Sequence, residues 1–135
     1  MMQDTSGKYT DEQKEKYYNL AIEYYKKAIE LKDDYFDALF NLGVIYYNRA
    51  NKIWVDAGNL PLSENEKFEK ERQRAKDTYK EAQKYMEKAH QVNYKDKDVI
   101  KALMIIYSRL GMHDKQKEMK ELLDNLPDAA NPLGN

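Results

Sequence analysis

Glu87 and His90 stand three residues apart, which is the Glu-x-x-His spacing with which helix bundles bind a pair of iron or manganese ions. Such a centre needs a second copy of the motif and two further glutamates on facing helices. The other histidine, His113, has Leu110 three residues before it rather than a glutamate. The pattern therefore favours a solvated His90 on a helix, and a metal-binding helical bundle is the weaker alternative.

Other catalytic chemistry has few residues to use. The chain has no cysteine, which excludes disulfides, thiolate metal sites and a cysteine nucleophile. The five glycines are scattered singly, so no phosphate-binding loop is indicated. Two histidines in unrelated predicted helices do not suggest a Ser-His-Asp triad. We predict no catalytic, cofactor-binding or metal residue, no small-molecule substrate, and a protein that is not an enzyme.

The charge balance and the hydropathy limit the classes of partner that the sequence predicts. A length of 135 residues fits one domain, and 23 basic against 24 acidic residues leave a net charge of −1. No strongly basic face is implied, so nucleic acid is not predicted as a partner. Uncharged apolar stretches are far shorter than the ~20 residues that span a bilayer, so no membrane insertion is expected. Residues 1–6 lack a signal-peptide core, and the compartment stays open.

Five helices and no strand are predicted from apolar residues that recur at three- and four-residue steps. Thr10 with Gln13, and Ser63 with Glu66, have the spacing of capping boxes. Gly58 is expected to end the second helix in a left-handed conformation. The expected helices cover about residues 10–32, 35–57, 63–93, 97–110 and 113–125, between an extended or disordered leader at 1–9 and a flexible tail at 127–135.

Two of these helices repeat earlier ones at one constant offset along the chain. The segment 21–28 (AIEYYKKA) matches 82–89 (AQKYMEKA) in the position of its alanines and large residues. At the same offset, Leu39, Leu42 and Tyr46 are followed by Ile100, Leu103 and Tyr107. Two separate helices that repeat at one offset indicate a repeat protein.

These residues resemble the tetratricopeptide repeat (TPR) family, whose 34-residue unit is a pair of helices. Leu39-x-x-Leu42-Gly43-x-x-Tyr46 is similar to the first-helix signature, and segments 21–28 and 82–89 are similar to the second helix. The resemblance implies an all-α fold of antiparallel helix pairs, an α-solenoid with a right-handed superhelix. A single domain over 10–126 would comprise a half repeat (10–33), an elongated repeat (34–95) and a terminal repeat (96–126).

The offset is longer than one unit of the family, and the additional residues are expected to lengthen two helices into a projecting hairpin. Facing apolar stripes on these helices predict an antiparallel, coiled-coil-like pair, in which Arg72 occupies one step of the stripe. Leu60 and Leu62 are expected to close the tip over Trp54 and Phe68.

The resemblance also implies a concave groove lined by the first helix of each unit, which accepts a peptide or an extended segment. Chaperone-binding members clamp a terminal carboxylate with lysine, arginine and asparagine, and here only Asn41 fits, so a hydrophobic or aromatic-rich ligand is expected. The alternative is that, with fewer than three full units, the groove is shallow and filled with solvent. The matching positions are Asp37, Phe40, Asn41, Val44, Tyr47 and Asn48, followed by Asp98, Lys101, Ile105, Ser108 and Arg109.

The first helix carries two apolar stripes and therefore predicts two neighbours. One stripe contains Tyr17, Tyr24 and Leu31, and the other contains Tyr18 and Tyr25. The second helix supplies one neighbour, and the other would be a second chain, a preceding unit, or the end of this chain folded back. The alternative is that tyrosine tolerates water through its hydroxyl group.

The favoured function is a non-enzymatic protein–protein interaction module or scaffold, with a protein or peptide partner and a homo-oligomer as an option. The alternative is a purely structural helical domain that forms part of a longer repeat array.

Overall fold

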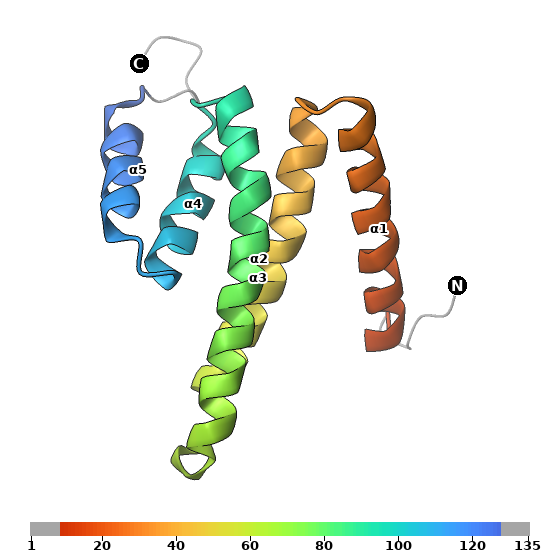
Figure 1. Ribbon diagram of the computed structural model, residues 1–135, viewed down its shortest axis with the longest axis vertical. Helices are drawn as coiled ribbons and strands as arrows, with labels where there is room; N and C mark the ends of the chain where they lie inside the picture. The colour runs from red at the N-terminus through yellow and green to blue at the C-terminus, as the bar shows by residue number, and fades with distance from the viewer. Residues whose placement is uncertain (1–8, 128–135) are drawn as a thin grey trace.

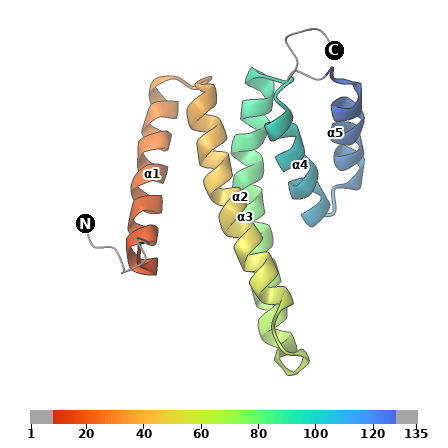
Figure 2. The same cartoon turned by 180° about the vertical axis from the view of Figure 1, so that it is seen from behind.

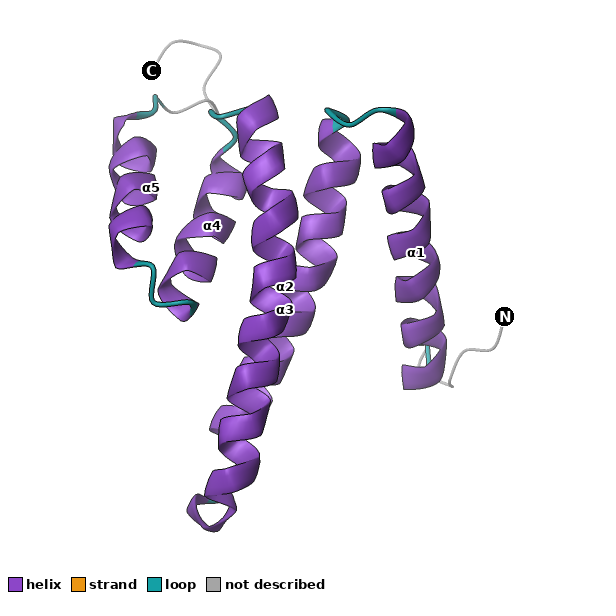
Figure 3. Ribbon diagram, viewed as in Figure 1, coloured by secondary structure: helices purple, strands orange, loops and turns teal. Residues whose placement is uncertain are grey.

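The computed structural model describes residues 9–127, and within that range the chain is all-α. The expected leader (1–9) and tail (127–135) lie almost wholly outside the described residues. Figures 1 and 3 show the helices, which confirm the predicted all-α fold. They are α1 (Asp11–Leu31), α2 (Phe36–Gly58), α3 (Asn65–Val92), α4 (Lys97–Arg109) and α5 (His113–Asn125), with a short 3-10 turn η1 (Leu62–Glu64) before α3.

The helix ends confirm one predicted cap and correct two others. At the start of α1, Gln13 N donates to Thr10 Oγ1 (3.1 Å) and Thr10 N donates to Gln13 Oε1 (2.9 Å), which is the predicted capping box. The box predicted at Ser63 is wrong, because Ser63 lies inside η1 and Glu64 caps α3 without a side-chain hydrogen bond. Gly58 does not adopt a left-handed conformation either, because it is the last helical residue of α2.

The end of α4 shows where a left-handed glycine is needed. Gly111 has a φ of 73°, and the Met112 N–H donates to the Tyr107 carbonyl at 2.8 Å while the Gly111 N–H donates to the Ser108 carbonyl at 3.2 Å. This pair of hydrogen bonds is the Schellman motif, which requires a positive φ that glycine adopts without a steric cost. The motif turns the chain sharply into α5.

The helices lie side by side in chain order, each packed against the next (Figure 1). In the view from behind, α2 and α3 again run together and project well beyond the ends of α1, α4 and α5 (Figure 2). This hairpin is the predicted arm. Because α2 and α3 are central, they each have two or more helical neighbours, whereas α1 packs against α2 alone among the described helices.

The core lies between α2, α3 and α4. Its fully buried members include Leu39 and Leu42 of α2, Met86 of α3, and Leu103 and Ile106 of α4. Alanines occupy the close contacts along the arm, because a methyl group lets two helix axes approach near the lower end of the usual range. The buried alanines of these two helices are Ala38, Ala50 and Ala57 on α2 and Ala75, Ala82 and Ala89 on α3.

The backbone repeats at the same offset as the sequence. In the turn between α1 and α2, the Tyr35 N–H donates to the Lys32 carbonyl at 3.1 Å; in the turn between α3 and α4, the Asp96 N–H donates to the Asn93 carbonyl at 3.2 Å. The preceding helix ends also correspond, since Lys32 N bonds Ala28 O and Asn93 N bonds Ala89 O. The two connections are therefore the same turn used twice.

The glycine inside α2 marks the closest approach of α3. A Cβ added at Gly43 would lie 3.0 Å from Met86 Cγ and Cε, and Met86 is itself fully buried. Glycine in the interior of a helix costs about 1 kcal/mol relative to alanine. The structural reason for accepting that cost is the close approach of Met86 on the neighbouring helix.

The arm tip differs from its prediction at Leu62. Leu62 is 99% exposed and does not cover Trp54 or Phe68. The guanidinium group of Arg72 lies there instead, with its central carbon 3.9 Å from the Trp54 ring centre and 4.7 Å from the Phe68 ring centre. Arg72 has a long aliphatic stem and a flat cationic group, so from its position in the apolar stripe it covers both rings. Leu62, on the turn at the tip, does not reach them.

Candidate functional site

A groove of about 270 Å³ runs between α2 and α4. Its lining combines apolar side chains of α2 with both apolar and charged side chains of α4, and Met86 of α3 contributes to the floor. Seven of the eleven positions predicted for the concave surface come together here. They are Phe40, Val44, Tyr47 and Asn48 from α2, and Asp98, Lys101 and Ile105 from α4.

The groove is apolar at its centre because of the repeat geometry. Val44 and Ile105 stand at equivalent positions of the repeat, on two helices that run in the same direction. Phe36 stacks on Phe40 with ring centres 5.9 Å apart, which fixes the aromatic wall near the start of α2. Ile105 is 40% exposed although it is a large aliphatic residue, so the groove presents apolar surface to solvent.

The other four predicted positions lie outside this lining. The Asn41 amide donates to the backbone carbonyl of Asp37 at 2.7 Å, so its side chain is used within α2. Ser108 is half-buried in the last turn of α4, where its carbonyl accepts the Gly111 N–H. Arg109 reaches across to the arm, where its guanidinium carbon is 4.8 Å from the Trp54 ring centre.

Trp54 and Tyr79 form an aromatic floor beyond the groove that the sequence did not assign to the site. Tyr79 is fully buried, and its ring makes edge-to-face contacts with Tyr47 (6.4 Å) and Trp54 (6.2 Å). The sequence signal for this aromatic floor is the spacing of Tyr47 and Trp54, which stand two helical turns apart and therefore on the same face of α2. The aromatic contacts of Tyr47 thus continue along the arm through Tyr79 to Trp54, outside the residues that line the groove.

The buried hydroxyl group of Tyr79 is satisfied by hydrogen bonding. It donates to Asn51 Oδ1 on α2. Burial raises the pKa of Tyr79 above its usual value, and the nearby Arg109 guanidinium opposes that rise. The phenol is therefore a neutral hydrogen-bond donor near pH 7, consistent with a structural role.

Glu87 and His90 do not form a metal centre with other residues of the described chain. Glu87 Oε2 accepts a hydrogen bond from the Tyr107 hydroxyl at 2.5 Å and another from the Gln83 amide at 3.2 Å. Burial lowers the pKa of His90, with Glu87 opposing. Between residues 9 and 127 no group of three or more histidine, aspartate or glutamate side chains is placed to hold a metal ion.

The tyrosines of α1 divide between two sides of the helix. Tyr25 packs against the core, and Tyr18 lies under Arg49 of α2, whose guanidinium carbon is 5.4 Å from the ring centre. Tyr17 makes an edge-to-face contact with Tyr9 (5.1 Å), and Tyr24 is 69% exposed. The stripe that contains Tyr18 and Tyr25 has α2 as its neighbour, and the Tyr17–Tyr24 stripe has no helix over it within residues 9–127.

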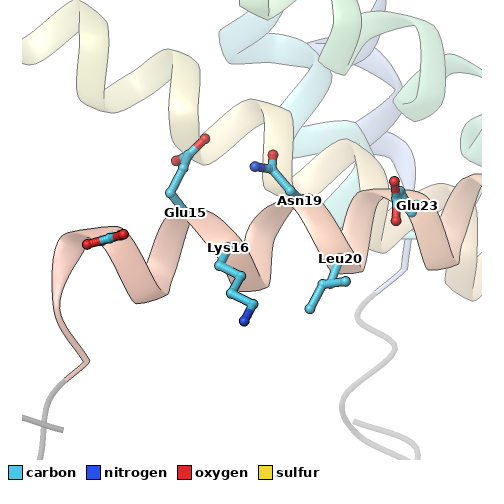
Figure 4. A pocket seen from close by; sticks show the side chains of 6 residues that line it. Glu15, Lys16, Asn19, Leu20 and Glu23 are labelled. Carbon is cyan, nitrogen blue, oxygen red and sulfur yellow. The ribbon is translucent and has the colours of Figure 1, made fainter. Parts of the chain in front are cut away.

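A shallow hollow on the flank of α1 does not form a site. Figure 4 shows Lys16 and Leu20 pointing away from the other helices, whereas Glu15 and Asn19 point toward them. All six residues that line it belong to this one helix, so it has no opposing wall. Glu15 is moreover paired with Arg49 at 2.8 Å.

A larger hollow of about 770 Å³ lies between α1, α2 and α3, on the other side of α2. Its charges are largely matched within the chain. Arg49 pairs with Glu15 at 2.8 Å, Lys52 with Asp56 at 3.2 Å, and Arg74 with Glu71 at 2.7 Å. A surface whose charges already have partners offers less to a ligand than one with unmatched charge, so this hollow is a weaker candidate than the groove between α2 and α4.

No described helix combines the length and the hydropathy needed to cross a bilayer. In comparisons with known proteins, a family model described as "TPR repeat" matches residues 14–49, which covers α1 and the first part of α2. No curated protein and no solved structure matched the chain. The family match over residues 14–49 confirms the predicted resemblance to the tetratricopeptide repeat family, and the described residues form an all-α fold consistent with a helical repeat.

Proposed function

We propose that this protein is a non-enzymatic interaction module that holds an apolar segment of a partner protein in the groove between α2 and α4. The tetratricopeptide repeat suggests protein binding in general terms. The observation that carries the proposal is the convergence of Phe40, Val44, Tyr47 and Ile105 on one open groove. Apolar surface in a preformed groove binds a ligand because removing it from water is favourable, by roughly 25 cal/mol for each Å².

The groove suits this task because its walls are rigid. Both α2 and α4 are anchored by fully buried residues on their opposite faces, among them Leu39, Leu42, Leu103 and Ile106. When a segment binds, only the segment loses conformational freedom, because the groove is already formed. This reduces the entropic cost of association. Asp98 and Lys101 at the rim supply polar contacts that fix the register of the segment.

The test compares a groove substitution with a matched one elsewhere. Randomised peptides displayed on phage are selected against the wild-type protein, and the enriched peptides are titrated against Ile105→Ser and Val55→Ser. Val55 is 57% exposed on α2 and does not line the groove, so it matches Ile105 in exposure but not in position. We expect Ile105→Ser to weaken binding by about tenfold and Val55→Ser to leave it unchanged.

Equal affinity of the wild type and Ile105→Ser for every enriched peptide would contradict the proposal. Circular dichroism of each variant establishes that its helices are intact. Both changes affect partly exposed side chains, so neither is expected to unfold the protein.

A second candidate interface is the outer face of α1. Tyr17, Leu20, Tyr24 and Leu31 are all exposed there, and α1 has no buried residue at all. We propose that this face associates with another helix, either of a second copy or of a partner. Sedimentation of the wild type and of Tyr24→Lys at rising concentration tests self-association, and identical monomeric behaviour of both would exclude it.

A further inference from the structure

The four arginines of this chain fall into two classes. Arg49 and Arg74 are bonded to the carboxylates of Glu15 (2.8 Å) and Glu71 (2.7 Å). Arg72 and Arg109 instead lie over the Trp54 ring, and no carboxylate in the described part of the chain is within ion-pair distance of either. The Nε atoms of both are buried without a hydrogen-bond partner. Two positive charges thus lie against one aromatic ring, and no carboxylate of residues 9–127 forms an ion pair with either.

The sequence brings these two arginines together from distant places. Arg72 comes from the arm portion of α3, and Arg109 is the last residue of α4. Gly58 at the end of α2 makes room for the first of them, since a Cβ there would lie 3.0 Å from Arg72 Nη2. Because like charges repel and each guanidinium loses hydration on stacking, an arrangement without a counter-charge costs free energy.

This cluster lies at the arm end of the proposed binding groove. Arg109 follows Ile105 by one helical turn, and Trp54 follows Tyr47 by two turns, so both lie on the arm side of residues that line the groove. Tyr79 contacts both Tyr47 and Trp54, which makes the aromatic floor continuous. A segment in the groove that extends toward the arm therefore meets the two guanidinium groups.

We propose that the partner segment carries an aspartate or glutamate side chain whose carboxylate pairs with Arg72 and Arg109 beside Trp54. A guanidinium that stacks on an aromatic ring uses its flat face, and its N–H groups remain in the plane to donate to a carboxylate. The carboxylate supplies the missing negative charge. The inference rests on the proposed function. It adds the chemistry of one residue of the bound segment and the orientation of that segment, whose acidic residue lies toward the arm.

The test uses two synthetic peptides based on the peptide selected against the wild type, acetylated and amidated so that only side chains carry charge. One keeps its acidic residue and the other has glutamine there. Trp54 is the single tryptophan of the chain, so its fluorescence reports binding at this position directly. We expect the acidic peptide to bind about tenfold more tightly than the glutamine peptide, and salt to reduce the difference.

The variants locate the effect. In Arg72→Gln/Arg109→Gln the two peptides are expected to bind equally, whereas Arg74→Gln, two residues away and already paired with Glu71, keeps the preference. Arg72→Lys/Arg109→Lys retains both charges and is expected to keep part of the preference, which guards against a glutamine variant that fails to fold.

Equal binding of the two peptides to the wild type would overturn this inference and leave the proposed function standing. The same holds if the preference persists in a folded Arg72→Gln/Arg109→Gln variant. If Ile105→Ser binds the selected peptides as tightly as the wild type does, the proposed function itself fails.

Discussion

Helices α1 and α3 have related sequences and very different surroundings. Tyr24 on α1 and Tyr85 on α3 stand at equivalent positions of the repeat, yet Tyr24 is 69% exposed and Tyr85 is 6% exposed. Tyr85 stacks on Tyr46 of α2 with ring centres 5.9 Å apart. The alanines follow the same division, since Ala82 and Ala89 are fully buried and Ala21 and Ala28 are half-buried.

The difference lies in the number of neighbours. Helix α3 packs against α2 and α4, whereas α1 packs against α2 alone within the described chain. The contact that both helices do share is similar in kind: Tyr46 lies near Lys26 of α1, whose pKa it raises, and Tyr107 bonds Glu87 of α3. Equivalent side chains thus face equivalent tyrosines. The additional neighbour of α3, helix α2, accounts for the greater burial of the residues on α3.

The largest contrast should appear between the two equivalent tyrosines. Tyr85→Ala is expected to lower the free energy of unfolding by about 3 kcal/mol, because a buried aromatic ring is lost and a cavity remains. Tyr24→Ala is expected to change it by less than about 0.5 kcal/mol, since its ring is mostly in water. Urea unfolding followed by circular dichroism measures both. A comparable loss for Tyr24→Ala would show that the outer face of α1 is covered in solution.

The close approach of α2 and α3 can be tested by a double-mutant cycle. Gly43→Ala is expected to lower the free energy of unfolding by about 1 kcal/mol, since crowding of Met86 outweighs the gain in helix propensity. In a Met86→Ala background the same change is expected to be stabilising, by about 1 kcal/mol. Tyr25→Ala, at the position of α1 equivalent to Met86, serves as the control and should leave the cost of Gly43→Ala unaltered. A cost independent of Met86 would mean that another contact excludes the side chain.

The contact between α3 and α4 includes a hydrogen bond from one buried tyrosine hydroxyl group. Tyr107→Phe removes the hydrogen bond to Glu87 and is expected to cost about 1–2 kcal/mol, because Tyr107 is buried and its acceptor is charged. Tyr46→Phe, the equivalent change facing α1, should cost no more than about 0.5 kcal/mol, since Lys26 is exposed. Thermal and urea unfolding of both variants give the comparison, which equal costs would contradict.

The smallest expected effect is the pH dependence due to His90, whose equivalent on α1 is the non-titrating Ile29. Burial lowers the pKa of His90 in the folded chain, with Glu87 opposing. Below the ordinary histidine pKa of about 6.5 the unfolded chain binds the proton more readily, so stability falls as the pH drops through the lowered folded pKa. His90→Gln should make the free energy of unfolding less dependent on pH between about pH 7 and pH 5.5. An unchanged slope would show that His90 is hydrated in the folded protein.

Most of the fold could be predicted because its signals are local. The capping box at Thr10 and the apolar stripes of the arm follow from residues a few positions apart in the sequence, where spacing alone fixes the geometry. The wrong predictions at Ser63, Gly58 and Leu62 fall at the arm tip, where the same residues are compatible with several different turn conformations. The conformation there depends on how Arg72 covers the aromatic rings, which is a contact between helices.

The sequence by itself determined the all-α repeat and its constant offset, because both follow from periodic side-chain spacing along single helices, and the resemblance to the tetratricopeptide repeat family implied which two helices line the groove. Only the tertiary structure decided which equivalent residues are buried, and that Arg109 leaves the predicted groove to join Arg72 at Trp54. The physical reason is that burial and unpaired charge depend on the number and nature of neighbours, and residues on separate helices become neighbours only after folding. The interface role of Tyr17 and Tyr24 stays a prediction for the same reason, because it depends on a neighbour that is not among the described helices.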